Sequence, residues 1–408
     1  MNKAMNSCSL CGQCTVTCPN GFDMSQVCRS ARENMVSTDK MPLAPHEFAL
    51  MDMLFSNSEA FLCKPQPGFD ICRYVFFPGC QAGAIAPDVV MDVYEDLCRR
   101  VEGGVALILG CCGAISEWAG RYEMTEKVNE QLKQELAKLG DPAIIAGCPS
   151  CMKQLKESTG AVVTGVWEIL KEIGLPETAR GLEVPVAIHD ACGARGDVHT
   201  QDTIRELLTE MGCTVENTEY SRDLSPCCGY GGGLTAYANK EMAAKMTEKC
   251  LERSDAPYIT YCMACRDRFA REGRESRHIL ELLYGDNACN MPDISEKRYN
   301  RLMLKEKLLK NIWNEELMME KKDYTVAYTE DAIRMMDERM ILKSDVEHVL
   351  ADYRESQEAV FDEETKELVT RSRLGNVTFW VRFVETEDGY LVHRAYSHRM
   401  NIMKRVGQ

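Results

Sequence analysis

The chain has 408 residues, of which 45% are hydrophobic and 27% charged, values ordinary for a globular protein of two or three domains. The formal net charge of −15 argues against nucleic-acid binding, which needs clustered Lys and Arg. No apolar signal core follows Met1, and no apolar run is long enough to span a bilayer. We therefore expect a cytoplasmic, reducing and anaerobic setting, in which the 21 cysteines do not form disulfides.

The first motif is a cysteine run with the spacing C-x2-C-x2-C-x3-C-P, which is typical of a [4Fe-4S] cubane site. Its members are Cys8, Cys11, Cys14 and Cys18. Two helices are expected after it: 25–32 begins with a capping serine, and 46–55 has apolar residues at helical spacing. Residues 1–72 are therefore predicted to form a small helical, ferredoxin-like module.

From residue 73 onward, short buried strands alternate with amphipathic helices. In the first half, 73–180, strands are expected at 74–77, 105–109 and 143–146, and helices at 88–101 and 121–139. In the second half, 181–290, strands are expected at 184–188, 213–218 and 258–261, and helices at 202–211 and 239–253. This order predicts an α/β fold with a parallel sheet in each half.

Ten cysteines form two matching sets of five at the ends of these strands. The first set is Cys80, Cys111, Cys112, Cys148 and Cys151, and the second set is Cys192, Cys227, Cys228, Cys262 and Cys265. Corresponding members lie 112 to 116 residues apart, so we expect two half-domains related by a pseudo-twofold axis. Open α/β sheets bind ligands at the carboxyl ends of their strands, which is where both sets are expected.

Five thiols in one place indicate a particular kind of metal site. Thiolates select zinc, copper(I) or iron–sulfur clusters. A closed zinc site takes four ligands, whereas each set offers five and includes two adjacent cysteines. Iron–sulfur clusters are therefore favoured over two structural zinc sites with a spare cysteine each.

The carboxyl-terminal part, 295–408, has no cysteine and a different composition. Helices are expected at 295–322, 329–339 and 343–353, and strands at 367–371, 376–384 and 389–396. A turn at Glu387-Asp388-Gly389 should join the last two strands as a hairpin. We predict a separate small α+β domain, to which no motif assigns a role.

The two cysteine sets resemble the duplicated CCG domain of the heterodisulfide reductase catalytic subunit. This domain pair also occurs in the iron–sulfur subunits of glycolate and lactate oxidation systems and of some succinate:quinone reductases. The resemblance covers 73–290 and all ten cysteines. It implies a non-cubane [4Fe-4S] cluster in each set, with a disulfide cleaved between the two. The chain has no flavin or nucleotide fingerprint, so a flavoprotein or ferredoxin partner is expected within a hetero-oligomer.

Members of this family usually carry a second ferredoxin run before the first set. Here only Cys63 and Cys72 stand in that place, which we interpret as a decayed run that leaves one cubane. In two-cluster modules the fourth cysteine of one run serves the other cluster, so the fourth ligand is either Cys72 or the local Cys18. A second cubane that used Cys18, Cys28 and Cys63 would lack a clear fourth thiol.

Disulfide reduction also consumes protons, and two polar residues just before Cys192 are candidates to supply them: His189 and Asp190. A hydrogen-bonding role beside the ligand is the alternative. Arg195 and Arg266 could hold an anionic substrate.

Three functions are compatible with these features. The first is a subunit resembling heterodisulfide reductase, in which the cubane takes single electrons and the two sets reduce a disulfide or a similar two-electron acceptor. The second is an electron-transfer-only subunit of a glycolate- or lactate-type or quinone-linked complex. The third is a metal-stabilised adaptor without catalysis.

Overall fold

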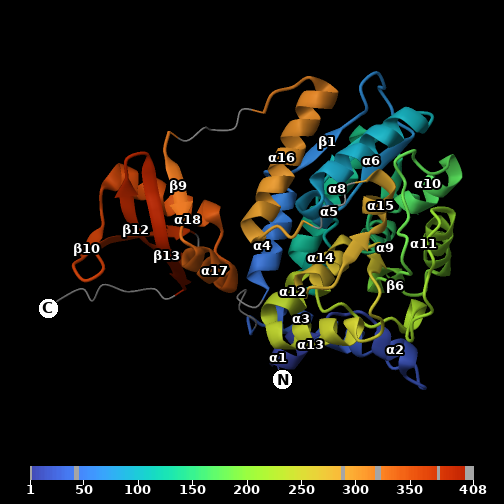
Figure 1. The fold of residues 1–408 in the computed structure, drawn as a ribbon, viewed down its shortest axis with the longest axis horizontal. Coiled ribbons are helices and arrows are strands. Elements are labelled where there is room, and N and C mark those ends of the chain that lie inside the picture. The colour runs from blue at the N-terminus through green and yellow to red at the C-terminus, as the bar shows by residue number, and fades with distance from the viewer. Residues whose placement is uncertain (1, 41–45, 286–289, 318–322, 375–376, 400–408) are drawn as a thin grey trace. The chain divides into compact units, whose positions relative to one another are not determined.

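The computed structural model describes residues 2–40, 46–285, 290–317, 323–374 and 377–399. The chain forms two compact units (Figure 1): the first contains 1–291 and 298–316, and the second contains 292–297 and 317–408. Helix α16 (Ile294–Trp313) therefore groups largely with the first unit, whereas a boundary at 295 was expected from composition. It also ends earlier than expected, and residues 318–322 of the expected helix lie outside the described residues.

Four helices precede the first sheet: α1 (Asn2–Ser7), α2 (Gln13–Thr17), α3 (Met24–Ser37) and α4 (Glu47–Ser56). The helices expected at 25–32 and 46–55 are thus confirmed. Asp23 caps α3, because its carboxylate accepts from the backbone N–H groups of Ser25 and Gln26.

The first sheet has the strand order β1-β3-β2-β4-β5. Its strands are β1 (Leu62–Lys64), β2 (Tyr74–Phe77), β3 (Val105–Leu109), β4 (Ala143–Ala146) and β5 (Val163–Gly165). All pairs are parallel except β1 with β3, so residues of the supposed decayed cluster run form an antiparallel edge strand. Every residue of the inner strand β3 is buried, as expected for a sheet covered on both faces.

Six helices accompany this sheet: α5 (Cys80–Ile85), α6 (Pro87–Arg100), α7 (Ala114–Trp118), α8 (Tyr122–Lys138), α9 (Pro149–Thr159) and α10 (Val166–Ile173). Among them, α6 and α8 match the helices expected at 88–101 and 121–139 within one residue at each end. The alternation of strands and helices that the sequence predicts is therefore confirmed in this half.

The second sheet is parallel throughout and has the order β6 (Ala187–His189), β7 (Tyr258–Thr260), β8 (Ser276–His278). Its helices are α11 (Val198–Glu210), α12 (Leu234–Ala238), α13 (Lys240–Leu251), α14 (Met263–Arg271) and α15 (Ile279–Tyr284). Short 3₁₀ turns occur at Cys192–Ala194 (η1), Arg222–Leu224 (η2) and Gly231–Gly233 (η3).

The prediction of a strand at 213–218 is wrong. Only one bridge, between Val215 and Val186, extends the sheet there. Strand β6, with which this segment would pair, begins only at Ala187. It does not extend further toward the amino terminus because Pro185 has no N–H group to continue the ladder. The mixed α/β class with parallel strands is nevertheless confirmed.

The second unit has the sheet order β10-β11-β12-β13-β9. Its elements are β9 (Thr325–Tyr328), α17 (Glu330–Arg339), α18 (Lys343–Ser356), β10 (Val360–Asp362), β11 (Glu367–Leu374), β12 (Val377–Thr386) and β13 (Gly389–His398). The two helices share an apolar core with the sheet, and the predicted hairpin is present, with Thr386 opposite Gly389. Residue 376, where the middle strand was expected to start, lies outside the described residues.

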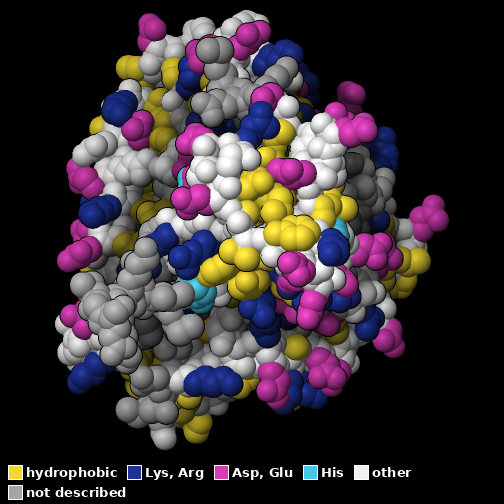
Figure 2. Space-filling view, turned by 90° about the vertical axis from the view of Figure 1, so that its left-hand side faces the viewer, with side chains coloured by type: hydrophobic (Ala, Val, Ile, Leu, Met, Phe, Trp, Pro, Cys, Tyr) yellow, Lys and Arg dark blue, Asp and Glu magenta, His cyan; other side chains and the backbone are white. Residues whose placement is uncertain are grey.

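The surface agrees with the charge argument. On the face drawn in Figure 2, Lys and Arg side chains alternate with Asp and Glu and do not form a continuous basic surface. Among the described residues, none of the helices combines the length and the apolar character that crossing a bilayer would require.

Candidate metal centre

Eight of the ten paired cysteines follow parallel strands of the two sheets, whereas Cys227 and Cys228 follow the 3₁₀ turn η2. Cys80 begins α5 directly after β2, and Cys192 begins η1 directly after β6. Cys148 and Cys262 are the residues before the first turns of α9 and α14, and the backbone N–H groups of Ser150 and Cys151 in α9 contact the Cys148 thiol. This placement at the carboxyl edges of both sheets is what the strand–cysteine spacing indicates.

The thiols of the first set contact one another in series. Cys80 contacts Cys111, Cys111 contacts Cys112, Cys112 contacts Cys151, and Cys151 contacts Cys148. Contacts with neighbouring thiols and with the amides of Ser150 and Cys151 hold the pKa of Cys148 well below its usual value, although burial opposes this. This end of the set is therefore suited to a thiolate.

The second set repeats this series and joins the first. Cys192 contacts Cys227, Cys227 contacts Cys228, and Cys265 lies between Cys228 and Cys262. The Sγ atoms of Cys228 and Cys265 are 3.1 Å apart. Across the two halves, the thiol of Cys148 contacts that of Cys262. Ten sulfurs therefore form one continuous line.

One cavity of about 460 Å³ accompanies this line, and all ten cysteines contribute to its wall. The apolar residues Ile115, Trp118 and Met263 line it, together with the charged residues Arg29 and Lys153. The cavity lies within the first unit and brings both cysteine sets to the same space.

A glycine allows the close approach of the two halves. A Cβ added to Gly193, next to Cys192, would lie 2.6 Å from the backbone nitrogen of Ser150 and 2.7 Å from its Oγ. Gly193→Ala is therefore expected to push η1 away from α9 and to lower the iron content of freshly reconstituted protein. Iron and sulfide analysis checks this, with Gly196→Ala as a control for backbone strain without a clash, because φ is +82° there and nothing lies within 4 Å of an added Cβ. Equal iron loss in both variants would contradict this account.

The amino-terminal run lies against the second set. The thiol of Cys11 contacts that of Cys227. Arg195 holds this segment in place, because its guanidinium donates to the carbonyl of Cys11 at 2.8 Å and to that of Ser225 at 2.7 Å. The Arg195 side chain is thus occupied by carbonyl oxygens.

A thiol that was not among the predicted ligands of this cluster lies beside the run. Cys28, on α3, is 3% exposed, and its thiol contacts that of Cys8 and lies near Cys14. Burial, followed by the neighbouring Cys8, raises the pKa of Cys28. One helical turn later, the fully buried Arg32 donates to the carbonyl oxygens of Met5, Cys8 and Trp118.

The two cysteines predicted as alternatives for the fourth ligand lie elsewhere. Cys18 faces the backbone N–H groups of residues 20–22, which lower the pKa of its thiol. Cys72 is buried next to Cys98, at the start of β2 and so at the sheet edge opposite Cys80. Cys63 pairs with Ile108 in the sheet. The structure therefore brings Cys28, and not Cys72, to Cys8.

These environments fit iron–sulfur clusters. Each set offers soft donors in excess of the four that zinc takes, together with helix N-termini that favour negative charge. Beside Cys8 and Cys28, the buried guanidinium of Arg32 pairs with no carboxylate of the described residues. A buried cation needs a nearby anion, which a thiolate-ligated cluster would supply.

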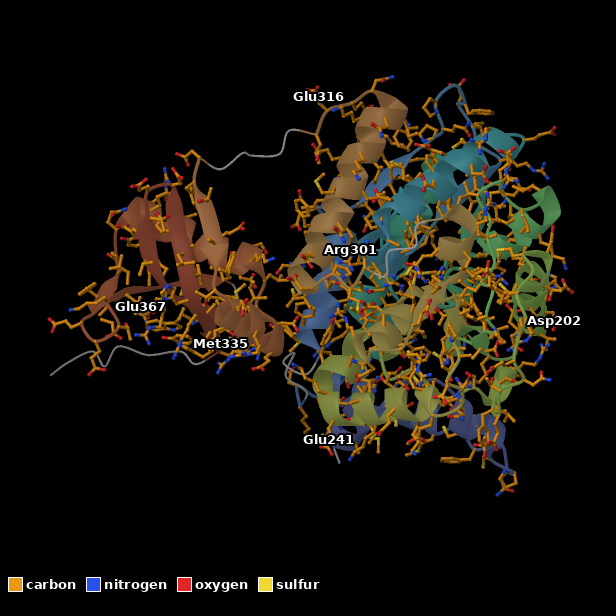
Figure 3. All side chains as sticks on the ribbon, viewed as in Figure 1. Asp202, Glu241, Arg301, Glu316, Met335 and Glu367 are labelled. Atoms are coloured by element: carbon orange, nitrogen blue, oxygen red, sulfur yellow. The ribbon has the colours of Figure 1, made fainter. Side chains whose placement is uncertain are left out.

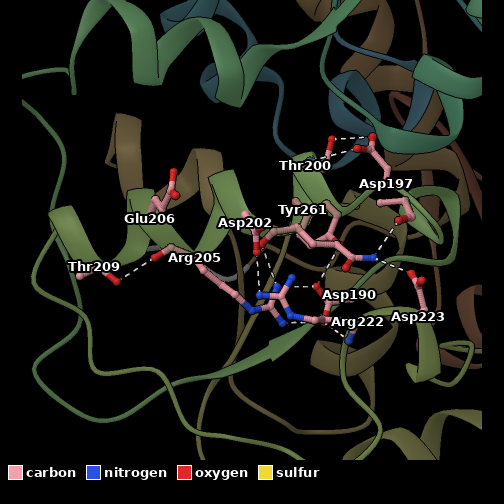
Figure 4. Close-up of polar contacts among 12 residues, drawn as sticks. Asp190, Asp197, Thr200, Asp202, Arg205, Glu206, Thr209, Arg222, Asp223 and Tyr261 are labelled. Carbon is pink, nitrogen blue, oxygen red and sulfur yellow. Dashed lines mark hydrogen bonds and ion pairs between the residues drawn. The ribbon is translucent and has the colours of Figure 1, made fainter.

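The candidates for proton supply have clear partners. Asp190 is 1% exposed and accepts from Arg205 at 2.8 and 2.9 Å, from the backbone of Arg222 at 2.6 Å and from Tyr261 Oη at 3.1 Å (Figure 4). Burial alone would raise the pKa of Asp190, but these donors outweigh it and lower the pKa. Burial, followed by the charge of Arg253, lowers the pKa of His189 to about 3. Asp190 is therefore ionised and His189 neutral at cellular pH.

Arg266, considered for an anionic substrate, is fully buried. Its guanidinium pairs with Glu281 at 2.6 Å, so it stabilises the fold around α14 and α15.

The pairing of Cys28 with Arg32 was not predicted from the sequence. The two residues are four positions apart on one helix, and this spacing is the signal that could have placed them side by side.

Comparison with known proteins supports the assignment of these domains. The model of the cysteine-rich domain family named CCG matches residues 74–156 and 186–269. An uncharacterized iron–sulfur protein of Methanococcus maripaludis is 23% identical over 281 residues, which are 64% of this chain and 55% of that protein. A second such protein, from Methanocaldococcus jannaschii, is 24% identical over 297 residues, 66% of this chain and 59% of that protein. The chain thus spans less than two thirds of either relative.

Two similar proteins have named activities. One is a subunit of the dihydromethanophenazine:CoB–CoM heterodisulfide reductase of Methanosarcina acetivorans, which is 22% identical over 306 residues, 67% of this chain and 73% of that protein. The other is a subunit of the fumarate reductase (CoM/CoB) of Methanothermobacter marburgensis, which is 24% identical over 309 residues, 69% of this chain and 62% of that protein.

The chain thus has two cysteine-rich domains around buried thiol sets, and it is similar to iron–sulfur proteins and to subunits of reductases. The matches to the CCG domain model and to subunits of these two reductases confirm the resemblance to the heterodisulfide reductase catalytic subunit that the sequence shows.

Proposed function

We propose that this chain takes single electrons at its amino-terminal cysteine run and delivers them to the two paired cysteine sets, where a disulfide or a similar two-electron acceptor is reduced. The observation that carries this proposal is the continuous line of thiol contacts from Cys11 through both sets, along one cavity. The relatives named as parts of reductases support it.

The proposed ligand sets follow the contacts described above. The first cluster is held by Cys80, Cys111, Cys112, Cys148 and Cys151, and the second by Cys192, Cys227, Cys228, Cys262 and Cys265. Each bound [4Fe-4S] cluster would supply a one-electron site, and we expect the two to be of the non-cubane type. Cleaving RSSR′ to RSH and R′SH takes two electrons and two protons, so two neighbouring one-electron sites can act without releasing a thiyl radical.

The chain's own residues shape the site. The apolar wall with Ile115, Trp118 and Met263 limits water around the sulfurs. Neither His189 nor Asp190 is placed to exchange protons, because one is buried and neutral and the other is ionised in an ion pair. The protons would come from water or from charged groups at the cavity wall, such as Lys153.

The donor is proposed to be a flavoprotein or ferredoxin that docks near the amino-terminal run. Cys14 is exposed there, and several apolar side chains on the neighbouring segments of the chain are exposed as well. These are Val16 (46% exposed), Phe22 (58%), Met24 (38%) and Val27 (40%). Exposed apolar side chains that are grouped on a surface are typical of a protein–protein contact site, whereas single ones are common on any surface.

For the amino-terminal cluster we propose Cys8, Cys11, Cys14 and Cys28 as ligands, with Arg32 as counter-charge. Cys28→Ala is expected to remove the iron of one cluster and its reduced-state EPR signal, because the remaining thiols are too few to close the site. The matched control Cys72→Ala should keep both, since that thiol lies at the opposite sheet edge. Loss of this signal in Cys18→Ala or Cys72→Ala, and not in Cys28→Ala, would overturn the assignment.

An electron-transfer-only role is the second candidate, and the lack of an evident proton donor at His189 and Asp190 favours it. One experiment separates the two. The full chain, purified without oxygen and analysed for iron and sulfide, is assayed with reduced viologen and a panel of disulfides. Turnover supports reduction at this chain. Full iron and rapid electron uptake without turnover supports the relay, and bound zinc without sulfide would contradict both.

A further inference from the structure

His189 and Phe77 occupy equivalent places in the two halves. Each is the last residue of the first strand of its half, β6 or β2, and each precedes the first cysteine of its set by three positions. Both side chains are only 1% exposed. The second half therefore has a buried imidazole at the position where the first half has a buried phenyl ring, and only the imidazole has an N–H group to donate.

Arg253 determines which ring nitrogen of His189 carries the proton. Its Nη2 lies 3.2 Å from Nδ1 of His189. A guanidinium can only donate, so Nδ1 must accept through its lone pair. In the neutral ring the proton is then on Nε2.

That Nε2 atom is buried and has no hydrogen-bond partner among the described residues. Sulfur atoms are close by: a ring nitrogen of His189 and the Sγ atoms of Cys228 and Cys265 lie within 4.8 Å of one another. Phe269 packs edge-on against the imidazole, with ring centroids 4.8 Å apart, and restrains the ring. A buried N–H group without an acceptor is destabilising, so this group points to an acceptor that the second set provides.

We propose that the Nε2–H group of His189 donates a hydrogen bond to sulfur at the second cysteine set and thereby raises the reduction potential of that site alone. The proposal deepens the proposed function, because it requires that both sets hold clusters. His189 acts as a positioning residue and not as a ligand, since Nε2 keeps its proton. Reduction adds negative charge to sulfur, and an N–H dipole directed at that sulfur stabilises the reduced form.

The first test compares His189→Phe with the unaltered chain in an EPR-monitored redox titration without oxygen. This substitution copies the residue of the first half and keeps an aromatic ring against Phe269. The expected result is unchanged iron, a more negative midpoint potential at one of the paired sites, and no change at the other. The control is His199→Phe, on the exposed surface of α11, which should leave both potentials unchanged.

Two results of this test would overturn the inference. Unaltered potentials with full iron would show that the N–H group does not act on the site. Loss of the iron of one cluster would show that His189 is a ligand. If the unaltered chain itself holds no iron at the paired sets, the proposed function fails together with the inference, and this outcome is distinct from the other two.

A second measurement needs no variant. In protein labelled with ¹⁵N-histidine, hyperfine spectroscopy of the reduced second site should show a weakly coupled proton that exchanges in D₂O, and no strong nitrogen coupling. A strong ¹⁵N coupling would identify a directly bound nitrogen. The absence of any histidine-dependent coupling would place the N–H group too far from sulfur, and either result would overturn the inference.

Discussion

Replacing Cys227 with alanine is expected to reduce disulfide-dependent oxidation of viologen by about 100-fold or more. Removing a group that hydrogen-bonds to a metal ligand already lowers activity by up to about 100-fold, and removing the ligand itself should cost at least as much. Cys227 is 3% exposed and contacts Cys192 and Cys228 within its own set. It also contacts Cys11, so the substitution interrupts the sulfur line where the amino-terminal run meets the second set. Iron analysis, EPR and turnover on the same preparation measure the effect.

The matched control is Cys213→Ala. Cys213 is also buried, at 7% exposed, but the sequence places it outside both cysteine sets, and its sulfur accepts from the backbone nitrogen of Leu182 at 3.4 Å. It should keep full iron and activity. If Cys227→Ala keeps both as well, the second set does not lie on the electron path, and the proposed function is wrong in its central step.

Replacing Arg301 with methionine is expected to lower the free energy of unfolding of the first unit by about 3–5 kcal/mol, the usual cost of breaking a buried ion pair. Arg301 of α16 (Figure 3) is 4% exposed and donates to both carboxylate oxygens of Asp52, at 2.8 and 2.9 Å. It also donates to the carbonyl oxygen of Cys80 at 2.9 Å, which ties α16 to the first cysteine set. Urea unfolding of oxygen-protected protein measures the loss.

Controls separate charge from packing. Lys307→Met breaks an exposed pair with Asp88, whose side chain is 63% exposed, and should change stability by less than about 1 kcal/mol. Combining Arg301→Met with Asp52→Leu should recover much of the loss, because the carboxylate is removed together with Arg301, and Arg298, which also pairs with Asp52, is 18% exposed and can be hydrated. An Arg301→Met effect as small as that of Lys307→Met would contradict the importance of this pair.

The same pair predicts a pH dependence. Burial alone would raise the pKa of Asp52, but Arg301 and Arg298 outweigh it and hold the pKa below the usual value. A carboxyl with a lowered folded pKa stabilises the fold above its unfolded pKa of about 4, and this contribution is lost as the pH falls through the folded value. The stability difference between the unaltered chain and Arg301→Met should therefore be constant near neutral pH and shrink below about pH 4. A difference that grows with acid would contradict this sign.

The fold class and the paired cysteine sets follow from local patterns in the sequence. Short apolar runs such as 105–109 and 143–146 end at cysteines, and parallel strands bring their carboxyl ends to one edge. The repeat offset of 112 to 116 residues then indicates two such edges. Helices with clear apolar periodicity, including α6 and α8, agree with their predicted bounds for the same reason.

Other features depend on contacts between distant segments and could not be predicted in this way. The approach of Cys28 to Cys8 depends on how α3 packs beside α1 and α2, and spacing within one motif says nothing about it. Cys72 was considered as a ligand from its place in the sequence, but strand β2 separates its edge of the sheet from Cys80. The protonated nitrogen of His189 is determined by Arg253, 64 residues away in the chain.

The course of α16 decides where the chain can be divided. The helix begins in the segment 292–297, which belongs to the second unit, and continues from Arg298 to its end at Trp313 as part of the first unit. A fragment cut after Met291 would lose Arg301 and leave Asp52 without that partner, whereas one that extends to Glu316 retains it. Separate expression of the cysteine-bearing portion should therefore succeed only when this helix is kept on it.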